Sequence, residues 1–145
     1  MFFNSRKEFF LKKSKYQHRR HNKNLLMAHL IFVTKYRKKF LTGSFDEDIK
    51  QYLFEICVRY HWYIIRMQSD RDHIHMLVQY NPTDSITNIV STLKQHSTYL
   101  AWLHHGNMLK KHYWKEQTLW SDGYFAASIG QVSQKTIEHY IENQG

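Results

Sequence analysis

The chain has 145 residues, 42% of them hydrophobic and only one of them proline, which predicts one folded domain over residues 1–145 and excludes a disordered chain. The formal net charge of +9 favours a polyanionic partner, with nucleic acid as the first interpretation and an anionic membrane surface as the second. The short apolar runs exclude a membrane-spanning helix and a signal peptide, and the single Cys57 excludes an intramolecular disulfide, so we expect a cytoplasmic protein.

The first half of the chain predicts a basic arm, a strand, a helix and a hairpin. Residues 1–24 are basic and irregular, and we expect them to lie outside the core. Residues 25–34 are an apolar strand candidate, and a helix capped by Ser44 should follow and end near His61. Two further strands, at 63–67 and 73–80, are then joined by the short polar turn 69–72. So short a turn predicts an antiparallel hairpin.

The second half predicts two helices separated by a short strand. Asp84 or Ser85 can cap the first of them, which should run to about His104 and end at Gly106. A basic and aromatic connection leads to a strand at 124–129. A last helix, capped by Ser133, should then occupy residues 133–145.

The predicted order of elements is β-α-β-β-α-β, followed by the added C-terminal helix. This order is that of the ferredoxin-like, or RRM-like, α+β fold, in which two helices cover one face of a four-stranded antiparallel sheet. The strand 73–80 is central in that arrangement.

His73 and His75 are a candidate metal site on this central strand. Side chains at i and i+2 of a strand share one face, about 6–7 Å apart. Two imidazoles with the amide oxygen of Gln144 would suit Mg²⁺ or Mn²⁺ better than zinc. An ordinary pair of core histidines is the alternative. Asp72 either orients one of these histidines or is a plain turn carboxylate.

Tyr140 is a candidate nucleophile, because it lies four residues before Gln144 and shares its helix face. A phenol is almost fully protonated at neutral pH, so Tyr140 taken alone is better interpreted as an aromatic that packs the last helix. Beside a metal that polarises a phosphate, a tyrosine can instead capture the strand covalently and keep the energy of the broken bond for rejoining.

Two basic segments are candidate DNA contacts, with solvated loops as the alternative interpretation. Aromatic side chains, which make up 16% of the chain, also offer faces on which unpaired bases can stack. The candidate DNA-binding residues are Lys35, Tyr36, Arg37, Lys38, Lys110 and Lys111.

From about residue 16 to residue 145 the sequence resembles the single-tyrosine HUH transposases of the insertion-sequence-200/605 group, the IS200-like family. The segments that carry the resemblance are, in order, residues 29–38 (HLIFVTKYRK), 72–75 (DHIH), 119–121 (LWS) with 124–125 (YF), and 140–144 (YIENQ). The basic residues before Lys15 have no counterpart in this pattern.

The resemblance implies a homodimeric DNA transposase that binds hairpins at the two ends of a mobile element. Such an enzyme cuts and rejoins single-stranded DNA through a 5′-phosphotyrosine and a free 3′-hydroxyl. The match implies Tyr140 as the nucleophile and His73, His75 and Gln144 as the metal ligands. It also implies that the tyrosine helix can serve the histidine pair of the other subunit.

Two other functions stay open at this point. A domesticated relative would use the same chemistry on repeated hairpins of a host genome. A non-catalytic single-stranded nucleic-acid-binding module would use the same sheet as a platform, without metal and without a covalent adduct.

Overall fold

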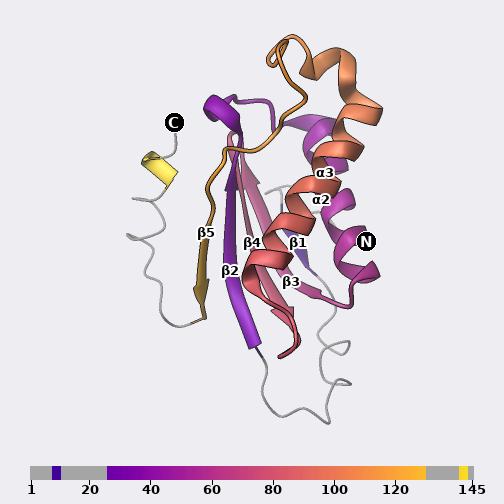
Figure 1. The fold of residues 1–145 in the computed structure, drawn as a ribbon. Coiled ribbons are helices and arrows are strands. Elements are labelled where there is room, and N and C mark those ends of the chain that lie inside the picture. Colours follow the sequence, from indigo (N-terminus) through magenta and orange to yellow (C-terminus); the bar gives the residue numbers. More distant parts are fainter. Residues whose placement is uncertain (1–7, 11–25, 130–140, 144–145) are drawn as a thin grey trace.

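The computed structural model describes residues 8–10, 26–129 and 141–143, and its centre is an antiparallel sheet covered on one face by two helices (Figure 1). The helices are α2 (Gly43–Arg59) and α3 (Ile86–Leu109), and a short 3-10 helix, η1 (Lys35–Arg37), follows the second strand. The strands are β1 (Glu8–Phe10), β2 (Leu26–Val33), β3 (Tyr63–Asp70), β4 (His73–Tyr80) and β5 (Phe125–Ser128). Their order across the sheet is β1-β3-β4-β2-β5.

The predicted α+β fold is confirmed, and β4 lies in the middle of the sheet as expected. The prediction that residues 1–24 are irregular is wrong for Glu8–Phe10, which forms a strand paired with the outer edge of β3. This pairing satisfies backbone groups of β3 that an open edge would leave exposed. The rest of that arm lies outside the described residues, as does the predicted helix 133–145 apart from residues 141–143.

The hydrophobic core lies between the sheet and the two helices. Alternation along β4 sends Ile74, Met76 and Val78 to this side, and each of them is completely buried. Leu30 and Phe32 of β2 reach the same layer. Apolar residues of α2 and α3 form the other side of the core, and they are Phe45, Ile49, Leu53, Ile56, Cys57, Ile89, Val90 and Leu93.

Both helices differ from the prediction at one end. Helix α2 begins at Gly43, so Ser44 is inside it, and Thr42 is the N-cap without a side-chain hydrogen bond. Gly43 has φ of 57°, a left-handed conformation that favours glycine. Helix α3 is capped by Ser85 as predicted, but it continues past Gly106 through a kink at His105.

The continuation of α3 has a packing reason. His105 Nε2 contacts Asp48 Oδ2 of α2 at 2.8 Å, and its ring packs edge-on against Phe45. Leu109 in the final turn is fully buried, so burial of this turn outweighs the cost of a glycine within the helix. In the described ranges, no helix combines the length and the apolar character needed to cross a membrane.

Candidate active site

The candidate site is on the sheet face opposite α2 and α3, which we call the open face. His73 and His75 of β4 point to this face, because their neighbours Ile74 and Met76 point into the core. Both histidines are half-buried. The predicted shared face of the two histidines is therefore present, on the central strand of the sheet.

A third histidine, His29 of β2, completes a cluster with this pair. Its Nδ1 lies 2.9 Å from His75 Nε2, and the two ring centroids are 5.0 Å apart. Burial, together with the charges of His29, Arg66 and His73, lowers the pKa of His75 to about 4. Burial and the charge of Arg66 also lower the pKa of His29. Both rings are therefore neutral near pH 7, and neutral imidazole is the form that binds metals.

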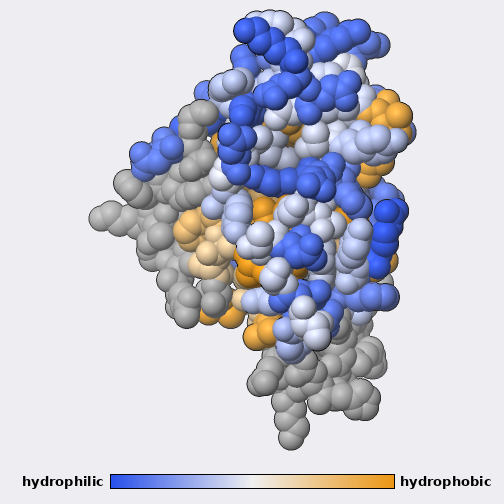
Figure 2. Space-filling view, in the orientation of Figure 1, coloured by the Kyte–Doolittle hydropathy of each residue, from blue (hydrophilic) through white to orange (hydrophobic). Residues whose placement is uncertain are grey.

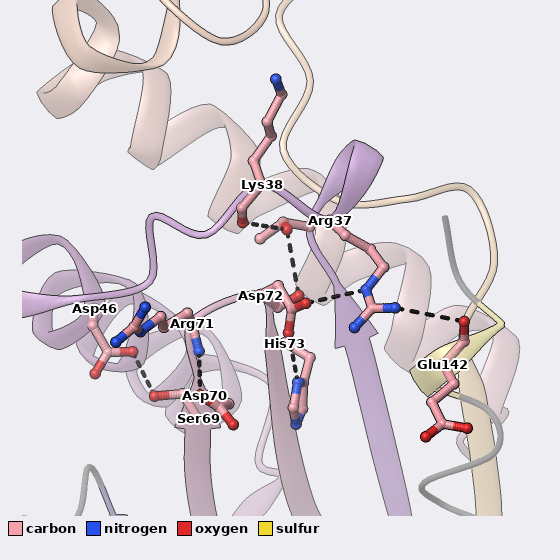
Figure 3. A network of polar contacts seen from close by, with 10 residues as sticks. Arg37, Lys38, Asp46, Ser69, Asp70, Arg71, Asp72, His73 and Glu142 are labelled. Atoms are coloured by element: carbon pink, nitrogen blue, oxygen red, sulfur yellow. Dashed lines mark hydrogen bonds and ion pairs between the residues drawn. The ribbon is translucent and has the colours of Figure 1, made fainter.

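Asp72 orients the other histidine of the pair. Its Oδ1 lies 2.9 Å from His73 Nδ1, and Arg37 Nε donates to its Oδ2 at 3.1 Å (Figure 3). Burial alone would raise the pKa of Asp72, but the hydrogen bonds to His73 and Arg37 outweigh burial, and the pKa lies below its usual value. When His73 donates from Nδ1 to this carboxylate, Nε2 keeps the lone pair that a metal needs.

The loop that carries Arg37 has a constrained backbone. Tyr36 and Arg37 have φ of 60° and 53°, values that are uncommon for residues with large side chains. Thr34 supports the loop, since its backbone N–H donates to Asp72 O and its hydroxyl donates to Lys38 O. Strain of this kind persists where the surrounding contacts determine the conformation, and it occurs often at functional sites.

The six predicted DNA contacts divide into two groups. Arg37 is engaged in the Asp72 network, and Lys35 Nζ lies 3.1 Å from the exposed carboxylate of Asp122. Tyr36 is 63% exposed, and the side chain of Lys38 extends away from the network in Figure 3. Lys110 and Lys111 are exposed just after α3. The role of all six in DNA binding stays a prediction.

The C-terminal segment that the structure describes, residues 141–143, lies on the open face. Ile141 packs against the buried cluster of Ile31 and Val33, and Arg37 Nη1 donates to the backbone oxygen of Glu142 at 3.5 Å. Arg37 thus connects this segment to the Asp72–His73 pair. Tyr140 and Gln144 lie outside the described residues, on either side of this segment in the sequence.

His29 is the residue of this cluster that the sequence analysis missed. His29, Ile31 and Val33 are alternate residues of one strand, so their side chains share a face. This pattern points to the histidine pair only when the pairing of Ile31 with His75 is known. Within the described part of the chain, no group of three or more His, Cys, Asp or Glu side chains could hold a metal ion. A metal held by His73 and His75 would therefore need oxygen ligands from elsewhere.

Comparison with known proteins identifies the family. Residues 22–144 match the family model described as "Transposase IS200 like". The chain belongs to the IS200-like transposase family. The resemblance inferred from the sequence motifs is thus confirmed, and a transposase is an enzyme that cuts and joins DNA.

Two similar proteins of known name are also transposases. The ISDra2 transposase TnpA of Deinococcus radiodurans is 29% identical over 119 residues, which cover 82% of this chain and 84% of the relative. The transposase for insertion sequence element IS200 of Salmonella typhimurium is 27% identical over 116 residues, which cover 80% and 74% of the two chains.

Solved structures support the fold. A crystal structure from Deinococcus radiodurans R1, assigned as a transposase, matches with a TM-score of 0.78 at 27% identity and covers 86% of this chain and 95% of that one. A tyrosine transposase described as REP-associated and bound to a REP hairpin matches with a TM-score of 0.52 at 12% identity, over 87% and 68% of the two chains.

Proposed function

We propose that this IS200-like transposase cuts and rejoins single-stranded DNA through a covalent bond to Tyr140. The observation that supports this most is the position of the C-terminal segment. Ile141, the residue after Tyr140 in the sequence, packs on the same sheet face that carries His73 and His75. A nucleophile and a phosphate-polarising centre must meet at one phosphorus atom, and a shared face brings these elements together.

The reaction follows from the chemistry of a phenol and a phosphodiester. The Tyr140 oxygen bonds to phosphorus and loses its proton, the bond from phosphorus to the 3′ oxygen breaks, and that oxygen gains a proton. The products are a 5′-phosphotyrosine and a free 3′-hydroxyl. Rejoining is the reverse reaction with a new 3′-hydroxyl, and the covalent bond preserves the energy that it needs.

His73 and His75, with Gln144 as the third ligand, would hold the Mg²⁺ or Mn²⁺ ion. The donor set fits such an ion: both imidazoles lie on one face, Asp72 orients His73, and His29 contacts His75. When bound, the ion would polarise the scissile phosphate and offset the charge that develops on its oxygens. His29 is in this proposal a positioning residue, because it contacts His75.

We propose further that the protein acts as a homodimer on hairpin-bearing DNA ends. The hairpin in the structure of the REP-associated relative supports this choice of substrate. The net charge of +9 supports a polyanionic partner.

The substitution Tyr140→Phe tests the proposal directly. We expect it to abolish cutting of a hairpin-bearing single strand, because the attacking oxygen is gone, while hairpin binding is retained. The assay incubates labelled DNA with Mg²⁺ or Mn²⁺ and resolves the covalent adduct on a denaturing gel. Tyr99→Phe, at an exposed position of α3, is the matched control and should cut normally. Undiminished adduct with Tyr140→Phe would refute Tyr140 as the nucleophile.

A further inference from the structure

A pocket lies beside η1, at the end of the molecule where the segment after α3 returns to the sheet. Its volume is about 530 Å³, within the ~300–1,000 Å³ that is usual for ligand sites. Four of the side chains that line it are aromatic. Its main lining residues are Tyr36, His112, Tyr113, Trp114, Lys115 and Glu116. We call it the aromatic pocket.

Two of its aromatic rings are presented to solvent instead of being packed in the core. Trp114 is 75% exposed and Tyr36 is 63% exposed. Tyr113 forms a rigid wall between them and the core, because it is buried and its hydroxyl donates to Lys35 O at 2.7 Å. The Tyr36 ring lies 6.4 Å from the Tyr113 ring, centroid to centroid. Large exposed aromatic rings around a hollow indicate a binding surface.

The backbone supports the same interpretation of Tyr36. Its φ of 60° is a left-handed conformation, which is strained for a large side chain. The loop is held in place by the Thr34 N–H bond to Asp72 O and by the Lys35 N–H bond to Leu119 O. These contacts keep an apolar ring exposed at a fixed position, although a relaxed loop would avoid the strain.

Lysines outnumber the one carboxylate, Glu116, at the pocket. Lys38 and Lys111 are both close enough to His112 to act, after burial, in lowering its pKa. Lys115 lines the pocket itself, and Lys110 adjoins Lys111 in the sequence. Figure 2 shows strongly hydrophilic residues gathered over this end of the molecule, where the C-terminal part of α3 and the following loop lie in Figure 1. A cationic rim around aromatic faces is the combination used to bind single-stranded nucleic acid.

We propose that the aromatic pocket binds one unpaired base of the DNA single strand by stacking on Trp114 and Tyr36. The inference rests on the proposed function and names a subsite for its substrate. Lys38, Lys111 and Lys115 contact the phosphates on either side of that base. A duplex does not fit this role, because both faces of a paired base are already covered by its neighbours.

The pocket is also connected to the candidate active site. Tyr36 precedes Arg37, whose guanidinium binds the Asp72 carboxylate that orients His73. A DNA strand whose base stacks on Tyr36 would therefore contact the residue next to Arg37, which belongs to the network that supports the metal ligands. The subsite would set the register of the single strand relative to the phosphate that is cut.

Trp114→Ala tests the subsite on the full chain. The probe is a fluorescein-labelled mixed-sequence DNA single strand of about 12 nucleotides, a length that covers a typical single-strand site. We expect Trp114→Ala to raise the Kd for this strand by about fivefold to a hundredfold and to remove most of the quenching of tryptophan fluorescence on binding. Trp114→Phe should restore most of the affinity, because it keeps a stacking face.

Two controls make the result specific. Tyr99→Ala removes an aromatic of similar exposure (66%) on α3 that does not line the aromatic pocket, and its Kd should equal that of the unaltered protein. The same strand paired with its complement should bind equally to the unaltered protein and to Trp114→Ala. Circular dichroism should show an unchanged fold, since Trp114 is mostly exposed.

Each alternative outcome contradicts the subsite. An unchanged Kd for the single strand, or an equal loss of affinity for single strand and duplex, overturns base stacking in the pocket. Tighter Trp114-dependent binding of the matched RNA overturns DNA as the occupant. The proposed function fails separately: the unaltered protein would then form no covalent adduct, whereas Trp114-dependent binding of the single strand would persist.

Discussion

The two faces of the sheet differ although the same strands supply both. On β4, Ile74 and Met76 are fully buried beneath α2 and α3, whereas His73 and His75, between and beside them, are half-buried on the open face. The helices exclude water from one face, so apolar residues stabilise the fold there. The open face keeps its histidines accessible. On one strand, the buried apolar residues thus stabilise the fold, and the histidines that alternate with them remain available for the reaction.

The open face is not uniformly exposed. Ile31 and Val33 of β2 are fully buried there, in contact with Phe125 and Ile141. The histidine cluster lies on the same face, where Ile31 pairs directly with His75. Apolar and chemical residues are therefore neighbours on this face, and the apolar ones provide the surface on which the C-terminal segment packs.

The largest expected effects come from substituting adjacent residues that belong to different faces. Ile74→Ala leaves a cavity in the core and should lower the free energy of unfolding by about 2–5 kcal/mol, with cutting per folded molecule preserved. His75→Ala should abolish metal-dependent cutting and lower the free energy of unfolding by about 1 kcal/mol or less, because it removes one partly exposed hydrogen bond. Urea denaturation measures the first effect and the adduct assay measures the second.

This pair also serves as its own control, because each variant tests what the other should leave unchanged. A large loss of stability in His75→Ala, or a loss of cutting in well-folded Ile74→Ala, would contradict the separation of roles between the faces.

A smaller effect is expected from Asp72→Asn. The amide keeps the shape of the side chain but removes the charge that orients His73 and binds Arg37, so Mn²⁺ affinity should fall by about 10–100-fold. Isothermal titration calorimetry with Mn²⁺ measures this change without reference to activity. Asp70→Asn, on β3 next to the same turn, is the matched control. Equal Mn²⁺ affinity in the Asp72 and Asp70 variants would show that Asp72 is a plain turn carboxylate.

The smallest expected effect comes from Ile141→Ala. Ile141 is half-buried against Ile31 and Val33, so truncation should weaken the packing of residues 141–143 by about 1 kcal/mol. Adduct formation should slow about fivefold while global stability stays nearly constant, which is measured by single-turnover kinetics and urea denaturation. Ile129→Ala, at an exposed position, should change neither quantity. Full activity of Ile141→Ala would mean that this contact does not position the tyrosine.

Much of the fold was predictable because its signals are local. The bounds of β4 were predicted correctly, since its apolar run is bounded by the polar turn 69–72 and by Asn81, all of them neighbours in the sequence. The shared face of His73 and His75 follows from the same alternation. The end of α3 was mispredicted, because the contacts of His105 with Asp48 and of Leu109 with the core lie far away in sequence.

The candidate site was predictable only in part. By itself the sequence determined the histidine pair, the order of the elements from β2 to β5 and the family, because period-two alternation and short motifs are properties of consecutive residues. Only the tertiary structure decided that His29 contacts His75, that Arg37 joins Asp72 to Glu142, and that Ile141 packs on the open face. The hydrogen bond between Arg37 and Glu142 alone joins residues 105 positions apart. Strand register and the packing of one element on another bring such residues together, and a local sequence pattern predicts neither of them.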